Sequence, residues 1–175
     1  MENSKEIQLD FEIDKLTNSI ENSISGETFI TLINQIKEKK EIKKSDWIFD
    51  WHSEINNISK SVWGLTTKNN QNIIQGLISI TDKGDHIFMD LIESAKFNKG
   101  KNKLYNGVSG NLVAFACKTS FDKGYGGVVS FIAKSQLIEH YSQTLGAKLF
   151  GKNRMYIDTR EAQILTTKYF KNFTT

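Results

Sequence analysis

A glycine turn that opens an apolar segment is the part of this sequence best suited to chemistry. Gly107, Ser109 and Gly110 stand just before the apolar residues 112–117, and residues 86–93 have the composition of a strand. A strand, a glycine turn and the start of a helix present several backbone N–H groups and a favourable dipole, which suit a phosphate. Glycine, and to a lesser degree serine, lets the backbone approach such a ligand closely. The pattern therefore predicts a phosphate site, although ordinary strand–loop–helix connections share it.

The histidines and the cysteine are less favourably placed for chemistry. His52, His86 and His140 lie in three different predicted elements without the spacing of metal ligands, so the sequence predicts no metal site. Cys117 has no histidine–carboxylate partner, which favours a small buried side chain over a nucleophile. A single cysteine excludes an internal disulfide, and the first residues lack the basic and apolar regions of a signal peptide. Both observations favour a cytoplasmic protein.

Composition and charge narrow the class of protein. The chain has 175 residues, of which 38% are hydrophobic and 25% charged, as is typical of a soluble globular protein. No apolar run approaches the ~20 residues of a membrane-spanning helix, so no membrane partner is expected. The net charge of +3 is concentrated in residues 37–44, which hold five lysines and two glutamates. Arg154 and Arg160 are the only arginines, and this scarcity makes a nucleic-acid partner an unfavourable interpretation.

Two sets of apolar residues recur at helical spacing in the first 45 residues. They are Leu16, Ile20 and Ile24, and then Phe29, Ile30, Ile33 and Ile36. These stripes predict two amphipathic helices, which form a helical arm over residues 1–45. Leu9, Phe11 and Ile13 alternate, so a short strand is also compatible with that stretch.

From residue 46 the pattern changes to that of a mixed α+β domain, which we place at residues 46–175. Strands are predicted around Trp47, Phe49 and Trp51 and over residues 61–67, 73–80 and 87–93, with short connections that indicate an antiparallel meander. A helix over residues 111–120 and a fully apolar strand over 128–133 follow; the latter suits a parallel position buried on both faces. A helix over residues 134–145 ends at Gly146, and two short strands (147–150 and 154–157) precede a helix over 161–173.

This order of elements, together with two short motifs, resembles the GNAT superfamily of acyl-CoA-dependent N-acetyltransferases over residues 46–171. In that family the fourth strand leads to an R/Q-x-x-G-x-G/A loop that opens a helix and holds the pyrophosphate of the cofactor. Gly107, Val108 and Ser109 fall on the G-x-G/A part, with Ser109 as the second small residue. Leu104 occupies the place of Arg or Gln, and Lys103 stands beside it.

The second motif is the helix that ends A-x-x-L-Y-x-x-x-G-F in the family, whose tyrosine often protonates the leaving thiolate. Tyr141 here precedes Gly146 by five residues rather than four. Ala147 replaces the family's aromatic residue, and Lys134 stands where an asparagine is common.

The resemblance implies a mainly antiparallel central sheet flanked by helices, and an activity that transfers an acetyl group from acetyl-CoA to a primary amine by direct attack on the thioester. The residues implied to hold the donor are Leu91 and Ile92 for the pantetheine arm, and Gly107, Val108, Ser109, Gly110, Asn111 and Leu112 for the phosphates. No metal is implied. The acceptor would be the amine of a small molecule or of a protein, and a homodimer is compatible with the sequence.

Two residues are candidates for the acid–base chemistry. Glu93 is the candidate base because it ends the strand beside the implied cleft; the alternative is a solvent-exposed strand terminus. Tyr141 is the candidate acid, or else an aromatic residue of the core. The irregular motifs also leave open a catalytically inactive GNAT-like module that binds acyl-CoA or another protein.

Overall fold

The computed structural model describes residues 6–16 and 19–170, which contain a seven-stranded mixed sheet. In spatial order its strands are β3 (Thr31–Ile36), β4 (Ser61–Thr67), β5 (Gly76–Asp82), β6 (Ile87–Ser94), β8 (Val129–Ile132), β10 (Arg154–Ile157) and β9 (Lys148–Leu149). Neighbouring strands are antiparallel except β6 and β8, which are parallel. A smaller sheet among the same residues joins β2 (Thr28–Phe29), β1 (Ile20–Asn22) and β7 (Tyr105–Asn106). The predicted α+β class with a mainly antiparallel sheet is confirmed.

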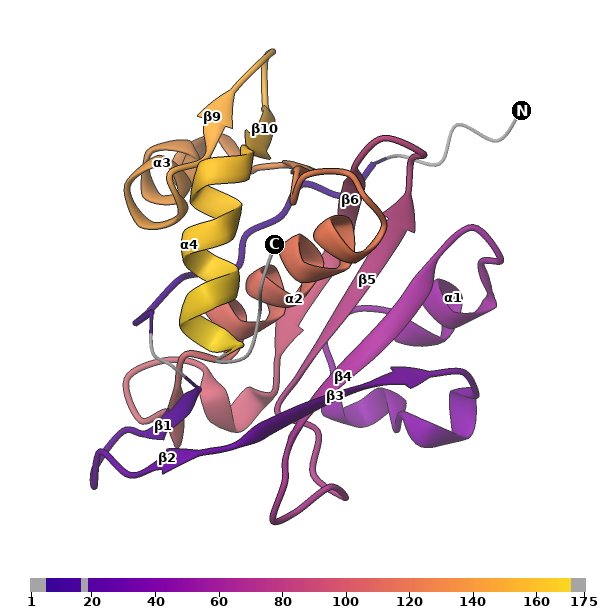
Figure 1. Cartoon of the computed structure of the whole chain (residues 1–175). Coiled ribbons are helices and arrows are strands. Elements are labelled where there is room, and N and C mark those ends of the chain that lie inside the picture. The colour runs from indigo at the N-terminus through magenta and orange to yellow at the C-terminus, as the bar shows by residue number, and fades with distance from the viewer. Residues whose placement is uncertain (1–5, 17–18, 171–175) are drawn as a thin grey trace.

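Helices cover both faces of the large sheet (Figure 1). On one face α2 (Val108–Asp122) packs against α4 (Thr159–Tyr169) and against β5, β6 and β8. On the other face lies α1 (Trp51–Asn56), next to β4, with the 3-10 turns η1 (Lys39–Glu41) and η2 (Lys44–Asp46) before it. Two further 3-10 turns, η3 (Lys96–Asn98) and η4 (Ser135–Leu137), precede β7 and α3 (Ile138–Leu145).

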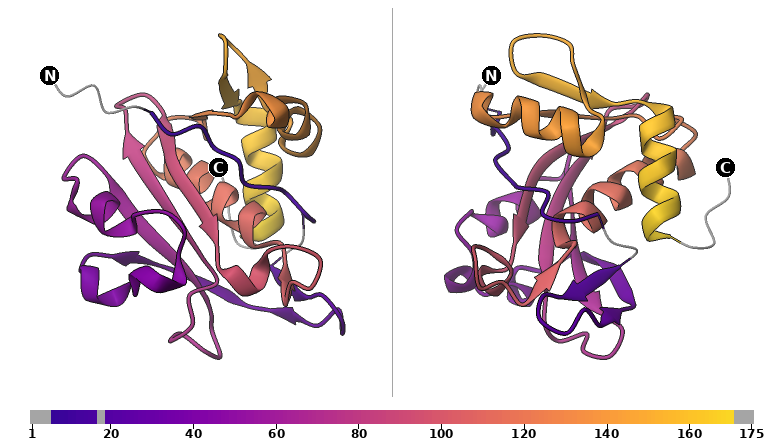
Figure 2. Two further views of the ribbon diagram at one scale, coloured as in Figure 1. Left: turned by 180° about the vertical axis from the view of Figure 1, so that it is seen from behind. Right: turned by 90° about the vertical axis from the view of Figure 1, so that its left-hand side faces the viewer.

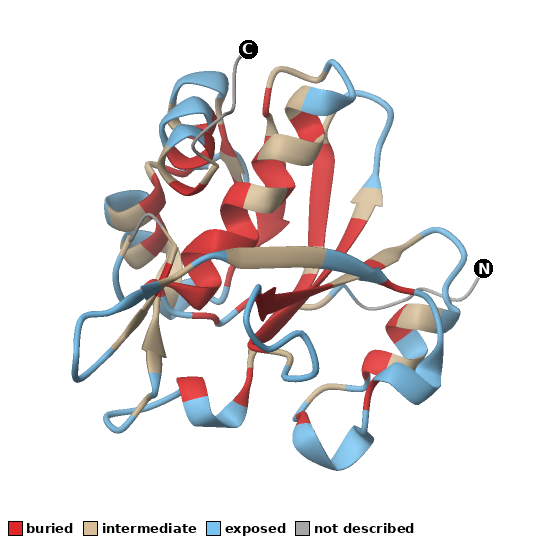
Figure 3. Ribbon diagram, turned by 60° about the horizontal axis from the view of Figure 1, so that its bottom comes forward, coloured by how far each residue is buried: buried red, intermediate tan, exposed pale blue. Residues whose placement is uncertain are grey.

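The core consists of two apolar clusters, one on each face of the sheet. The larger cluster joins α2, α3 and α4 to the sheet, and α2 is buried along most of its length (Figure 3). The smaller cluster packs Trp47 and Trp51 against Val62, Leu77 and Leu91. Leu77 and Ile78 on β5, and likewise Leu91 and Ile92 on β6, therefore face opposite sides of the sheet, as neighbouring residues of a strand do.

The predicted helical arm over residues 1–45 is wrong. The second stripe, residues 29–36, forms β2 and β3, and β3 pairs with β4 along its whole length. Residues 28–36 are rich in threonine and isoleucine, whose branched side chains favour a strand once a partner strand is available. The alternation of Leu9, Phe11 and Ile13 is the better guide: this stretch is extended, and Leu9 forms a parallel bridge with Ala133. Residues 1–5 and 17–18 of the predicted arm lie outside the described residues.

The strand predicted around Trp47, Phe49 and Trp51 is also wrong. η2 ends at Asp46 and α1 begins at Trp51. Asp50 caps that helix, because its side chain accepts a hydrogen bond from the Ser53 N–H at 3.1 Å. The tryptophans alternate in sequence, but a helix cap rather than a strand separates them.

The elements that shape the implied cleft agree with the sequence prediction. β4, β5 and β6 form the antiparallel meander, and β8 is buried and parallel to β6. α3 ends at Gly146, which has the left-handed φ of 66° that glycine tolerates. α4 ends at Tyr169, and residues 171–173 of the predicted last helix lie outside the described residues.

Candidate functional site

The site begins where the parallel strands β6 and β8 separate. They pair only at Ile87 with Val129 and at Phe88 with Ser130, so the rest of the β6 edge has no partner on β8. The edge of β8 is instead bonded to the N-terminal segment: the Leu9 N–H donates to the Ile132 carbonyl at 2.6 Å, and the Lys134 N–H donates to the Leu9 carbonyl at 3.0 Å. We call residues 8–14 the strap. Figure 2 shows this extended segment crossing the molecule beside α3.

The apolar side of the strap is part of the main core. Leu9, Phe11 and Ile13 are buried, and the Phe11 ring stacks on Tyr141 at a centroid distance of 4.7 Å. The Tyr141 hydroxyl donates to the Phe11 carbonyl at 2.6 Å, and the Ile13 N–H donates to Nε2 of His140 at 2.9 Å. The strap is therefore held by α3 as well as by β8.

At its end the strap delivers a carboxylate to the predicted phosphate turn. Gly107, the N-cap of α2, has a left-handed φ of 90°, and its N–H donates to Oδ1 of Asp14 at 3.1 Å. Nζ of Lys103 lies 3.0 Å from the other oxygen of the same carboxylate. A helix N-terminus with a nearby cation is a favourable site for an anion, and here the anion is a side chain of the protein itself.

A cavity of about 320 Å³ lies beside this ion pair. Its walls come from the strap, the end of β6, the start of α2, the loop before α1 and the loop after η3. Among the predicted donor-binding residues, Ile92, Val108 and Ser109 line it. The hydroxyl of Ser109 lies 3.2 Å from that of Ser94, which links α2 to the end of β6.

The other predicted donor-binding residues face elsewhere. Leu91 belongs to the smaller core cluster on the opposite face, and Leu112 is fully buried in the larger one. Gly110 lies against the Tyr169 hydroxyl, so its missing side chain serves the packing of α2 on α4. The Asn111 N–H donates within the helix to the Gly107 carbonyl at 3.0 Å. Of the predicted phosphate residues, the structure brings Gly107, Val108 and Ser109 together at the site.

Glu93 lies at the cavity, but it is neither an exposed strand terminus nor a free base. Glu93 is only 3% exposed. Its carboxylate accepts hydrogen bonds from two donors in the loop before α1 and from a third in the first residue of that helix. The donors are the Ile48 N–H at 2.7 Å, the Phe49 N–H at 3.3 Å and Nε1 of Trp51 at 2.7 Å. Lys99 adds an ion pair at 3.3 Å. In this arrangement Glu93 positions one wall of the cavity.

Tyr141 lies in the larger core cluster, among the aromatic rings of Phe11 and Phe131. Tyr141 is fully buried, and it does not line the cavity. Burial raises its pKa well above the usual range, and the carboxylates of Asp10 and Glu12 raise it further. The hydroxyl therefore keeps its proton at neutral pH, and in this structure that proton is donated to the strap.

The residues that sequence reasoning missed belong to the strap. Asp14 and Phe11 reach two positions implied for the donor, the phosphate turn and the tyrosine hydroxyl. The available signal was the alternation of apolar residues with Asp10, Glu12 and Asp14. This alternation is compatible with a strand that has one apolar and one acidic face, but it carries no information about where that strand lies.

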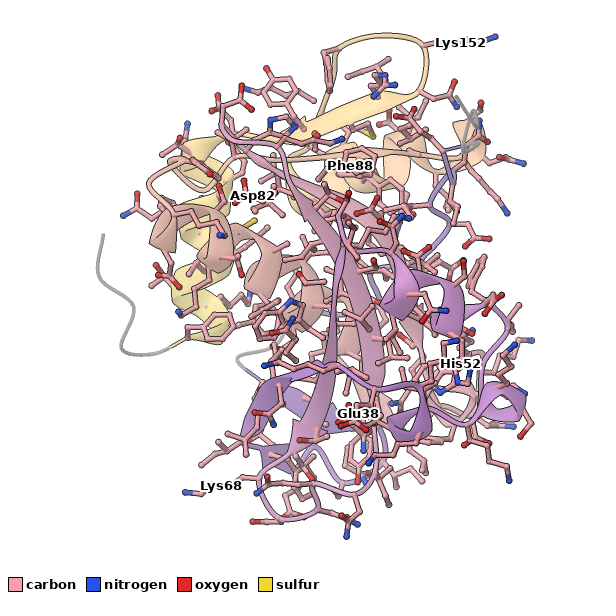
Figure 4. The ribbon with its side chains drawn as sticks, turned by 90° about the vertical axis from the view of Figure 1, so that its right-hand side faces the viewer. Glu38, His52, Lys68, Asp82, Phe88 and Lys152 are labelled. Carbon is pink, nitrogen blue, oxygen red and sulfur yellow. The ribbon has the colours of Figure 1, made fainter. Side chains whose placement is uncertain are left out.

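No histidine or cysteine lines the cavity, although His140 helps to hold the strap. Figure 4 labels His52 beside the turns that precede α1, where its Nε2 lies 2.7 Å from the Ile42 carbonyl. Cys117 is buried in α2, and desolvation raises its pKa, as expected for a packing residue. Within residues 6–16 and 19–170, no group of three or more histidine, cysteine or carboxylate residues is placed to hold a metal ion. In the same residues no helix has the length and apolar character needed to cross a membrane.

The sequence matches no protein-family model and no curated protein. The fold, however, matches solved structures. The KacTA–DNA complex gives a TM-score of 0.54 and AtaTR bound with AcCoA gives 0.53; each is 10% identical and covers 78% of this chain and 98% of its own. The Campylobacter jejuni N-acetyltransferase PseH gives 0.48 at 12% identity, covering 74% of this chain and 98% of its own. The first two similarities show that this chain shares the overall fold of these two structures, which is GNAT-like.

Proposed function

We propose that this chain, with its GNAT acetyltransferase fold, transfers an acetyl group from acetyl-CoA to a primary amine. The observation that carries the proposal is the carboxylate of Asp14 at the N-terminus of α2, where Gly107 and Lys103 bind it. A turn that binds a carboxylate with a backbone N–H and a lysine has the donors and charge that a pyrophosphate needs. The AcCoA in the AtaTR structure supports the same donor.

The fit of this chain to acetyl-CoA differs along the cleft. At the phosphate end, the first-turn N–H groups of α2 and Lys103 would hold the anionic groups. Along the pantetheine arm, the β6 edge beyond Phe88 would supply backbone groups around Leu91 and Ile92 once the strap has left the gap beside it. When bound, the donor supplies an acetyl thioester to the attacking amine. Tyr141, released from the Phe11 carbonyl, would present a protonated hydroxyl to the leaving sulfur.

The acceptor is a primary amine on a small molecule or a protein, and we give Glu93 a role on its side of the cavity. Glu93 would position the loop around Ile48 and Phe49 through the hydrogen bonds that it accepts from their N–H groups. A nucleic-acid partner is not part of the proposal, although one structural neighbour is a DNA complex. The lysine-rich residues 37–44 do not form a uniform cationic surface for such a partner, because Ile42 is buried and Lys40 pairs with Glu38 at 2.8 Å.

A catalytically inactive module with the same fold is the second candidate. The observation that favours it is that both acid–base candidates are engaged inside the protein: Tyr141 with the strap, and Glu93 with the loop before α1. An inactive module needs neither group free. Turnover separates the two candidates, because the inactive module would release no thiol from acetyl-CoA with any amine.

The test is isothermal titration of the full chain with acetyl-CoA, followed by a screen of primary amines with detection of the released thiol. Ser109→Asp should weaken donor binding about tenfold or more, because a carboxylate beside the phosphate turn repels the phosphates. Ser53→Asp, in the first turn of α1 and away from the cavity, is the matched control. Equal affinity in wild type, Ser109→Asp and Ser53→Asp would remove this turn from the donor site.

A further inference from the structure

We propose that the strap, residues 8–14, is a built-in competitor of the acyl donor, with Asp14 as its anionic group. The inference rests on the proposed function, since it concerns the regulation of the same site. In this arrangement the protein binds the donor only in the fraction of molecules whose strap has left the cleft.

The first argument is the identity of the groups that the strap occupies. Asp14 uses the Gly107 N–H and Lys103, the two groups best placed for a phosphate. A single N–H cannot donate a full hydrogen bond to a carboxylate and a phosphate at once, and the two anions repel each other. Bound phosphate and bound Asp14 are therefore mutually exclusive at this turn.

The second argument comes from the middle of the strap. The Leu9 backbone forms two hydrogen bonds along the edge of β8 and its continuation: its N–H donates to the Ile132 carbonyl, and its carbonyl accepts from the Lys134 N–H. Phe11 accepts the hydrogen bond of the Tyr141 hydroxyl, which the donor sulfur would need. One continuous segment therefore takes the phosphate turn, the gap between β6 and β8 and the tyrosine.

The third argument concerns how strongly the strap is held. Its outer ion pair, Asp10 with Lys134 at 2.7 Å, has both side chains more than 40% exposed, so it adds little. Asp14 and Lys103 are less exposed, at 19% and 23% of their side chains, and Asp14 also receives the Gly107 N–H. The rest of the stabilisation of the bound strap comes from the burial of Leu9, Phe11 and Ile13. The apparent dissociation constant of the donor equals the intrinsic value divided by the strap-free fraction, so weakening Asp14 tightens donor binding.

The experiment compares the full chain with Asp14→Asn and with Asp122→Asn as a matched control. Asp122 lies at the far end of α2 and does not line the cavity, and Asp122→Asn makes the same change of side chain and charge. We expect Asp14→Asn to tighten acetyl-CoA binding about tenfold and Asp122→Asn to change it less than about twofold. Hydrogen exchange of residues 8–14 should be faster in Asp14→Asn without ligand, and acetyl-CoA should accelerate it in the wild type.

Each alternative outcome contradicts a different statement. Equal donor affinity in wild type and Asp14→Asn, with strap exchange unaffected by acetyl-CoA, would overturn the competitor role and leave the proposed transferase intact. If no donor binds to the wild type, to Asp14→Asn or to the doubly substituted Asp10→Asn/Asp14→Asn, all with native circular dichroism, the transferase proposal fails and the competitor role fails with it.

Discussion

At the residue scale, Glu93 and Tyr141 both have their polar atoms bound inside the protein. The Glu93 carboxylate accepts from two backbone N–H groups and from Nε1 of Trp51, and Lys99 is its charged partner. The Tyr141 hydroxyl is bonded to the strap. A residue with such partners contributes to stability whether or not it also takes part in catalysis. The effect of its substitution must therefore be measured by unfolding experiments as well as by turnover assays.

For Glu93→Gln we expect the free energy of unfolding to fall by about 2 kcal/mol, because hydrogen bonds to a buried charge are lost. This corresponds to a decrease in Tm of roughly 4–8 °C for a chain of this size. Urea unfolding followed by tryptophan fluorescence measures it, and the exposed Glu139→Gln is the control. An unchanged unfolding free energy together with lost turnover would instead support the predicted base.

For Tyr141→Phe the expected effect depends on pH. The pKa of Tyr141 is raised in the folded protein, whereas a tyrosine in the unfolded chain titrates near pH 10. Its contribution is therefore fully present below about pH 10 and falls as the pH rises further, by about 1.4 kcal/mol per pH unit.

At neutral pH Tyr141→Phe should lower the free energy of unfolding by about 1–3 kcal/mol, because the buried Phe11 carbonyl loses its hydrogen-bond donor. Above pH 10 the substituted protein should show a shallower loss of stability than the wild type. Denaturant unfolding at pH 7 and pH 10.5 measures both differences, and parallel curves would contradict the assignment.

At the element scale, the contact between α2 and α4 limits the size of the side chain at position 110. A Cβ on Gly110 would meet the Tyr169 hydroxyl, so the Tyr169 ring or the two helices would have to shift. In an open helix position Gly→Ala stabilises by up to about 1 kcal/mol, but here overpacking should cost roughly 1–3 kcal/mol. Ser109→Ala, one position earlier in the same helix, is the control. A gain of stability in Gly110→Ala would show that the helices adapt without cost.

At the scale of the whole molecule, the strap joins the stability of the protein to the occupancy of its cleft. Phe11 packs against Tyr141 and Phe131, so Phe11→Ala should lower the free energy of unfolding by about 3–5 kcal/mol. The same substitution weakens the strap and should tighten acetyl-CoA binding.

Phe29→Ala, outside the strap and packed against Tyr105, should lower stability without tightening donor binding. Thermal unfolding and titration with acetyl-CoA together test this pair of variants. Weaker donor binding in Phe11→Ala, with a native circular dichroism spectrum, would contradict the competition between strap and donor.

Local patterns in the sequence determined the elements that shape the cleft. The meander β4–β5–β6, the buried β8, the glycine turn before α2 and the end of α3 at Gly146 all follow from periodicity and turn residues. These features depend on neighbours a few positions apart, which a sequence displays directly. The helical spacing at residues 29–36 led to a wrong prediction, because it also depends on near neighbours alone. The partner that makes this stretch a strand is β4, about 30 positions away.

Only the tertiary structure decided how the site is occupied. The Tyr141 hydroxyl meets the Phe11 carbonyl across 130 positions, the Gly107 N–H meets Asp14 across 93, and Glu93 meets the Ile48 N–H across 45. The sequence by itself shows that Leu9, Phe11 and Ile13 alternate with Asp10, Glu12 and Asp14, but it left a helix and a strand both open for this stretch. Where that segment lies depends on which strand edge and which helix N-terminus remain unpaired after the chain folds, and local periodicity carries no information about either.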